Sequence, residues 1–211
     1  MELIDGKLGA SASLRNEPVQ ARSTARLTAL LDAAAAAIDE LGYERLTTAM
    51  VAERAGASIG TVYRYFPDRI AVLQALATRN LDYVVRSIER AIGDRRATTW
   101  RDAVQGSFDV YVNAFRSQRG FASLRVGDVL DLRPATGAAT ANSHIADVMM
   151  NDIAARFGTD ASPVTLFAFE NAVEVQDALV ARAFARSSKG DATFLESGRA
   201  LVLSILSERL A

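Results

Sequence analysis

The chain has 211 residues, half of them hydrophobic, and its 24 Lys and Arg residues are balanced by 25 Asp and Glu residues. This length allows one substantial core, or a small domain joined to a larger one. The absence of cysteine excludes disulfides and cysteine-based zinc sites, and the single histidine excludes a di-iron helical bundle. We predict no cofactor and no metal.

The first 20 residues are polar and show no periodicity. We expect a flexible arm over residues 1–20, which is either an inert tail or a basic extension reaching the minor groove of DNA. This stretch lacks the basic start and apolar core of a signal peptide, and the alanine run 33–37 is too short to span a bilayer. We therefore expect a cytoplasmic protein without a membrane partner.

Residues 23–41 carry apolar side chains at helical spacing, and Gly42 ends the stripe. Leu46, Met50 and Val51 are expected to pack beneath this helix. Thr47 or Thr48 can cap the next helix, and either hydroxyl could also bind a DNA phosphate.

Residues 56–73 read as the second half of a helix-turn-helix. A short helix ends at Ala55, a Gly-Ala-Ser turn follows, Ser58 caps a helix over residues 59–66, and Pro67 stops it. Val62 and Phe66 are core anchors in this interpretation. The other side chains, Ser58 and Thr61 as short hydrogen-bonding groups and Tyr63, Arg64 and Tyr65 as long ones, suit a major groove.

Bulk charge does not support DNA binding, because the first 70 residues hold 8 basic and 9 acidic side chains. The inference depends on placement instead. Arg64 and Arg69 bracket the second helix, and the leading segment offers Lys7, Arg15, Arg22 and Arg26.

The motif resembles the recognition-helix signature of TetR-type transcriptional repressors. The matching residues are Ser58, Gly60, Thr61, Val62, Tyr63, Tyr65, Phe66, Asp68, Arg69 and Leu73, preceded by Glu40-Leu41-Gly42-Tyr43, Thr47-Thr48 and Val51 to Gly56. Val62 replaces a frequent leucine and Arg69 a usual lysine. The resemblance covers about the first third of the chain. It implies that the DNA-binding residues are Thr47, Thr48, Ser58, Ile59, Gly60, Thr61, Tyr63, Arg64, Tyr65 and Arg69, with Tyr63 on a phosphate.

The remaining sequence predicts only helices, since no alternating strand pattern appears. We expect helices over residues 68–92, 100–118, 126–132, 140–157, 163–186 and 192–210, with Ser162-Pro163 as a cap and first turn. The predicted fold is all-α. Its helix-turn-helix domain covers residues 21–68, and a larger effector-binding and dimerisation domain covers residues 69–211.

Aromatic residues cluster in the second domain, at Trp100, Phe108, Tyr111 and Phe115. They form either plain core or, as the resemblance implies, the wall of a pocket for a small, mostly apolar effector. In the second case His144, Asn171 and Glu174 would supply its polar contacts.

The last two helices carry more apolar side chains than one face requires, which indicates contact with a second copy of the chain. The predicted interface residues are Phe184, Phe194, Leu201 and Ile205. A homodimer would present two reading heads to a palindromic double-stranded operator.

An enzymatic function is not predicted. Residues 56–60 match the G-x-S-x-G nucleophile pattern by letter, but a helix precedes the serine where a hydrolase needs a strand. We interpret the chain as a ligand-responsive transcriptional repressor. The alternative is an all-α ligand-binding or enzymatic protein in which the helix-turn-helix is only structural.

Overall fold

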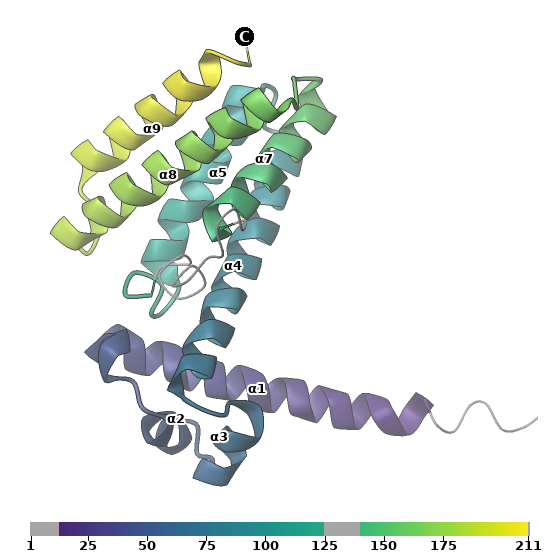
Figure 1. Cartoon of the computed structure of the whole chain (residues 1–211), viewed down its shortest axis with the longest axis vertical. Helices are drawn as coiled ribbons and strands as arrows, with labels where there is room; N and C mark the ends of the chain where they lie inside the picture. Colours follow the sequence, from purple (N-terminus) through teal and green to yellow (C-terminus); the bar gives the residue numbers. More distant parts are fainter. Residues whose placement is uncertain (1–12, 125–139, 211) are drawn as a thin grey trace, which may run out of the picture.

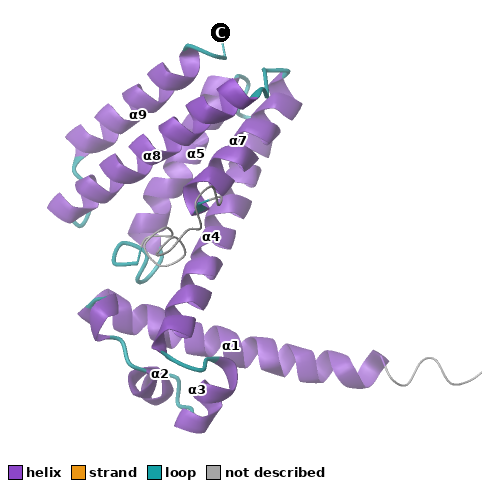
Figure 2. Cartoon of the chain, viewed as in Figure 1, coloured by secondary structure: helices purple, strands orange, loops and turns teal. Residues whose placement is uncertain are grey.

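The computed structural model describes residues 13–124 and 140–210, with side chains described from residue 21 onward. All the regular secondary structure in these residues is helical, as predicted (Figure 2). The elements are α1 (Ser13–Leu41), the short 3-10 helix η1 (Tyr43–Arg45), α2 (Thr48–Arg54), α3 (Ile59–Tyr65), α4 (Arg69–Gly93), α5 (Trp100–Ser117), α7 (Ala141–Phe157), α8 (Pro163–Arg186) and α9 (Ala192–Ser207).

The helices form a head and a body that are joined by α4 (Figure 1). The head holds α1, α2 and α3, and the body holds α5, α7, α8 and α9. Two separate clusters of buried side chains follow this division. The start of α4, including Leu73 and Leu76, belongs to the head cluster, whereas Val84, Ile88 and Ile92 belong to the body cluster. Packing therefore changes from one cluster to the other within α4.

Polar side chains cap the helix starts where the sequence predicted them. Thr47 caps α2, which decides between the two threonines, and its Oγ1 accepts from the N–H of Met50 at 3.2 Å. The other caps are Ser58 for α3, Asp68 for α4 and Ser162 for α8. Each cap satisfies a backbone N–H that has no partner inside its helix.

The first helix is longer than predicted. It begins at Ser13 rather than at residue 23, so residues 13–20 are helical and do not form an irregular arm. Its first part projects beyond the other helices (Figure 1). Residues 1–12 of the predicted arm and the helix predicted over residues 126–132 lie outside the described residues.

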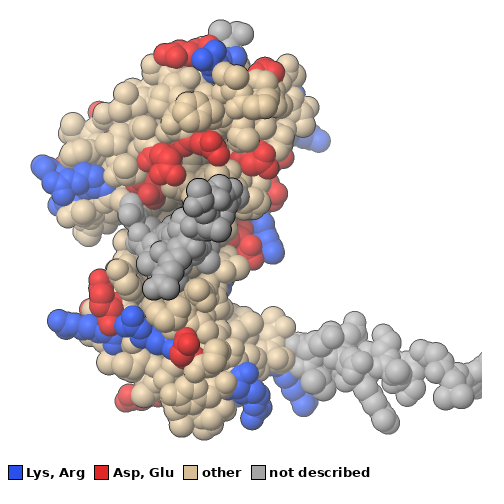
Figure 3. Space-filling view, in the orientation of Figure 1, with Lys and Arg blue, Asp and Glu red and all other residues tan. Residues whose placement is uncertain are grey.

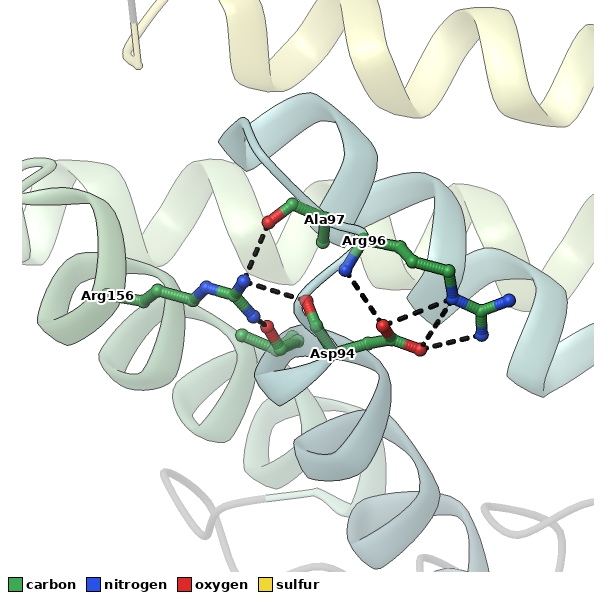
Figure 4. Close-up of polar contacts among 5 residues, drawn as sticks. Asp94, Arg96, Ala97 and Arg156 are labelled. Carbon is green, nitrogen blue, oxygen red and sulfur yellow. Dashed lines mark hydrogen bonds and ion pairs between the residues drawn. The ribbon is translucent and has the colours of Figure 1, made fainter.

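Arg156, in the last turn of α7, holds the end of α4 (Figure 4). Its guanidinium donates to the carbonyl oxygens of Ile92, Asp94 and Ala97, at 2.7 Å for the last two. Helix-terminal carbonyls have no partner inside their own helix, so a cation that binds them is well placed. Arg96 binds the Asp94 carboxylate at 2.7 Å and lowers the pKa of Asp94 to about 2.

The Arg156 contacts predict a measurable loss of stability on substitution. Arg156→Met removes charge-assisted hydrogen bonds to three carbonyls, and we expect it to lower the free energy of unfolding by about 2 kcal/mol. Chemical denaturation measures the change. Arg95→Met is the control, because Arg95 is exposed and makes no side-chain hydrogen bond within the described residues, and it should change stability by less than about 0.5 kcal/mol. Equal values for the two variants would contradict the role given to Arg156.

Candidate DNA-binding site

The turn between α2 and α3 has a fixed backbone. Gly56 adopts a φ of 58°, in the left-handed region that glycine enters without strain. The N–H groups of Gly56 and Ala57 donate back to Glu53 and Ala52 of α2 at 3.2 and 2.9 Å. The carbonyls at the end of α2 are thereby satisfied and the chain is aimed into α3.

Apolar anchors fix the inner face of α3. Val62 and Phe66 are buried with Val51 of α2 and with Leu30 and Ile38 of α1. On the outer side, Arg54 of α2 forms an ion pair with Glu40 of α1 at 2.5 Å, and this hydrogen bond lowers the pKa of the exposed Glu40 carboxyl. These contacts determine which face of α3 points outward.

The outward face of α3 carries both apolar and polar groups. Ile59 is 44% exposed and Tyr63 54% exposed, and Arg64 lies on the same exposed side. A Cβ added at Gly60 would meet only the Ser58 Oγ, at 3.9 Å. The protein's own packing therefore does not require glycine at position 60. A surface that must come close to another molecule would require it.

Several of the predicted DNA-binding residues form hydrogen bonds with one another. The Thr48 Oγ1 donates to the Tyr63 hydroxyl at 3.5 Å, which brings the start of α2 to the outer face of α3. The Ser58 and Thr61 hydroxyls lie 2.9 Å apart and bind each other. Thr47, Thr48, Ser58 and α3 thus meet on one surface.

Two of the predicted residues make contacts inside the head. The Tyr65 hydroxyl lies 3.2 Å from the Ser23 Oγ of α1, and the Arg69 Nη1 donates to the Glu44 carbonyl of η1 at 2.6 Å. Both side chains are half-buried. In this structure they position α3 and η1 relative to their neighbours.

A basic groove lies between α1 and α3. The predicted set of DNA-binding residues did not include the α1 side of this groove. The groove has a volume of about 730 Å³ and is lined by Arg22, Arg26, Thr61, Arg64 and Tyr65, among others. Figure 3 shows basic side chains near the point where α1 leaves the head. The spacing of Arg22 and Arg26, which places both on one helix face, is the sequence signal for this groove.

The body does not bring the predicted effector residues together. Trp100, Phe108, Tyr111 and Phe115 are buried, with Phe115 5.2 Å from Phe121 and stacked on Phe184 at 5.1 Å between ring centroids. The three polar residues, His144, Asn171 and Glu174, are instead exposed. They cannot contact the aromatic cluster from the outer faces of α7 and α8.

Different polar side chains reach the interior of the body. Gln176 is only 1% exposed, in line with Val173 and Val180 on the inner face of α8, and its Nε2 has no hydrogen-bond partner in the part of the chain that the structure describes. Next to it, Asp177 accepts a hydrogen bond from the Tyr111 hydroxyl. The spacing of Gln176 from Val173 and Val180 is the sequence signal that could have identified it.

The predicted interface residues differ in how far they are exposed to solvent. Leu201 of α9 is 46% exposed and Ile205 is half-buried, but Phe184 stacks on Phe115 and Phe194 lies beneath the Arg186 guanidinium at 5.5 Å. Val164 and Phe167 of α8, which are not among the predicted interface residues, are 55% and 62% exposed. Large apolar side chains thus reach solvent on both α8 and α9.

Family models match most of the chain. The model for bacterial regulatory proteins of the tetR family matches residues 30–76, and the model for the tetracyclin repressor-like C-terminal domain matches residues 98–210. The chain belongs to the TetR family. This membership identifies a DNA-binding transcriptional regulator and not an enzyme.

Solved structures of TetR-family regulators share the whole fold. A TetR-family transcriptional regulator from Streptomyces coelicolor is 30% identical with a TM-score of 0.74, covering 88% of this chain and 99% of that one. The transcriptional regulator FadR from Bacillus subtilis, whose crystal structure is in complex with stearoyl-CoA, is 18% identical with a TM-score of 0.62, covering 87% of this chain and 97% of that one. At that identity only the fold is shared.

Curated relatives match shorter stretches of the chain. The repressor KstR of Mycolicibacterium smegmatis is 37% identical over 62 residues, which is 29% of this chain and 30% of that protein. An HTH-type regulator of Mycobacterium bovis, Mb2274c, is 37% identical over 68 residues, which is 32% of this chain and 36% of that protein. The chain spans about a third of the length of these relatives.

The helices that the structure describes include no candidate for a membrane-spanning segment, because none combines sufficient length with sufficient hydrophobicity.

The open space around Gly60 gives a test that separates folding from binding. Gly60→Ala should leave the head as stable as the parent or stabilise it by up to about 0.5 kcal/mol, because alanine favours helix over glycine but position 60 lies in the first turn of α3. It should weaken operator binding at least tenfold if DNA backbone approaches this position closely. Gly93→Ala is the matched control, since a Cβ there meets nothing within 4 Å and position 93 lies at the far end of α4. Unchanged operator affinity in Gly60→Ala, measured by fluorescence anisotropy, would remove Gly60 from the interface.

Proposed function

We propose that the protein is a ligand-responsive repressor, which binds a palindromic operator as a homodimer and is released by a small, mostly apolar effector. In this proposal residues 21–68 form the DNA-binding domain, and residues 69–211 bind the effector and form the dimer. The observation that carries it is the division of α3 into an inner face fixed by buried anchors and an outer face on which Ile59, Tyr63 and Arg64 are exposed.

The proposed DNA contacts fall into two sets. Thr48 and Tyr63 are placed to bind phosphate, and Arg22 and Arg26 of the basic groove extend this set along α1. Arg64 is the side chain best suited to a base edge, because an exposed guanidinium can bind guanine in a bidentate manner. Tyr65 and Arg69 act by positioning α3 and η1.

The decisive experiment is binding to the DNA that flanks the protein's own gene. A gel shift with competitor DNA should reveal a sequence-specific complex whose affinity falls steeply with salt. DNase footprinting should then find two half-sites, spaced by about one DNA turn of roughly 34 Å. Binding that shows no sequence preference would favour the alternative, in which the helix-turn-helix is only structural.

The dimer is proposed to form through the outer sides of α8 and α9. These two helices pack side by side at the edge of the body, away from α4 (Figure 1). Val164, Phe167 and Leu201 expose apolar surface there. An apolar patch on a pair of helices suits a two-fold contact, in which each copy presents the same surface.

A charge in this patch should separate the two copies. Phe167→Lys should shift the protein toward monomer in analytical ultracentrifugation, because the lysine would have to lose water in an apolar contact. Operator affinity should fall with it, since a monomer reads one half-site. Leu41→Lys is the control, because Leu41 is also exposed but lies at the end of α1 in the head. A stable dimer of the Phe167→Lys variant would exclude this surface.

The effector is proposed to bind among the body helices, with Gln176 as its polar anchor. The buried, unpartnered Nε2 of Gln176 is a donor that a ligand acceptor could satisfy. Buried aromatic residues such as Tyr111 and Phe115 supply apolar contacts nearby on α5. The complex of FadR with stearoyl-CoA gives a precedent for a largely apolar ligand on this fold. Binding would act on the head through α4.

Gln176→Leu tests the anchor. The variant removes a buried unpaired donor at nearly constant volume, so the free ligand-less protein should be as stable as the parent or more stable. Compounds from a thermal-shift screen of aromatic, lipid-like and cationic molecules should stabilise the parent and release the operator. When its concentration is about 100 times its dissociation constant, such a compound adds roughly 2.7 kcal/mol to the free energy of unfolding. Retention of the full shift in Gln176→Leu would exclude Gln176 from the site.

A further inference from the structure

A cleft of about 390 Å³ lies at the junction of the head and the body. Its walls come from α1, from the middle of α4 and from the end of α5 with the turn that follows. The lining residues besides Ala35 are Asp32, Arg79, Asn80, Ser117, Gln118 and Arg119. The cleft is separate from the aromatic cluster of the body and from the outer face of α3.

The walls of this cleft are held together by close backbone contacts. The N–H of Gly120 donates to the Asp39 Oδ1 of α1 at 3.1 Å. Gly120 has a φ of 72°, and a Cβ there would meet the Ala35 carbonyl oxygen at 2.9 Å. Leu124, in the same segment, is fully buried in the head cluster. The segment after α5 is thus docked on α1, and head and body share the cleft.

One buried group in the cleft has no partner. Asn80 of α4 is 6% exposed, and its Nδ2 makes no hydrogen bond. An unpaired buried amide donor destabilises the folded state, so its retention at a cleft points to an acceptor that binds there. No acceptor for it is found among the described residues.

The charges around Asn80 indicate what the acceptor is. Asp32 contributes the one carboxylate of the lining, and it already accepts from Arg79 at 2.7 Å. Arg119 is exposed and its guanidinium makes no hydrogen bond within the described residues. Counting the described residues alone, the lining thus carries a net charge of +1 and has spare donors but no spare carboxylate, a combination that disfavours cations.

We propose that this cleft binds a small oxyanion, through a carboxylate or phosphate group that accepts hydrogen bonds from Asn80 and Arg119. Since the walls belong to both head and body, occupancy stabilises one orientation of the head. The anion therefore shifts operator affinity independently of any effector in the body. The binding step stands without the proposed function, whereas the effect on DNA depends on it.

The test is a titration of the full chain, in the absence of DNA, with inorganic phosphate, acetate or benzoate. Chloride at matched ionic strength is the reference. Two-dimensional NMR of the Asn side-chain amides and thermal unfolding are the measurements. We expect the Asn80 amide signals to shift on saturation, and a rise in Tm of about 3 °C at ten times the dissociation constant. Which of the three probes binds distinguishes a phosphate from a carboxylate source.

Three variants complete the design. Asn80→Leu should abolish the response without loss of stability, and Arg119→Gln, which alters only an exposed side chain, should weaken binding at least fivefold. Asn113→Leu is the control on the exposed side of α5 and should respond like the parent. The proposal fails if no probe gives a response beyond chloride, or if Asn80→Leu and Arg119→Gln both respond like the parent. Anion binding that leaves operator affinity within twofold would overturn the regulatory part alone.

Discussion

The structure depends on α4 being one unbroken helix that belongs to two hydrophobic clusters. Asp68 caps its start, its first turns are buried in the head with Leu73 and Leu76, and Val84 and Ile88 are buried in the body. Arg156 then fixes its last carbonyls to α7. Since a helix transmits a rotation or a tilt along its length, a change in body packing has to alter the way in which the head is presented.

The same logic explains why the outer face of α3 is available for recognition. Every strong internal contact of α3, from Val62, Phe66 and Tyr65, lies on the side that faces α1 and α2. The helix is too short to be stable alone, so these contacts also determine its existence. The backbone that carries Ile59 and Tyr63 is thereby held in place while both side chains remain in solvent, an arrangement that suits binding because little backbone freedom remains to be lost.

The sequence was most informative where local chemistry decides the structure. Caps such as Ser58 and Asp68, the glycine turn at Gly56 and the apolar stripe of α1 act within a few residues, so helix positions and the helix-turn-helix were predictable. The residues on the inner face of α8 could not be predicted in this way. This helix carries apolar side chains nearly all around, because one side packs in the body and the other remains exposed, and the pattern then cannot separate Asn171 from Gln176. Only the packing of α7 and α9 against it does so.

Among the described residues three buried side-chain polar atoms lack a hydrogen-bond partner, and two of them, on Gln176 and Asn80, lie where a bound ligand could change the position of α4. Gln176 lies in the body on α8, and Asn80 lies on α4 itself, where the helix leaves the head. A ligand at Gln176 would have to act through the packing of the body on α4. A ligand at Asn80 would bridge α4 to α1 directly. It would therefore restrain the orientation of the head without acting through the packing of the body. Because both sites bias the same helix, their ligands must be thermodynamically coupled to each other as well as to DNA, and the coupling is equal in both directions.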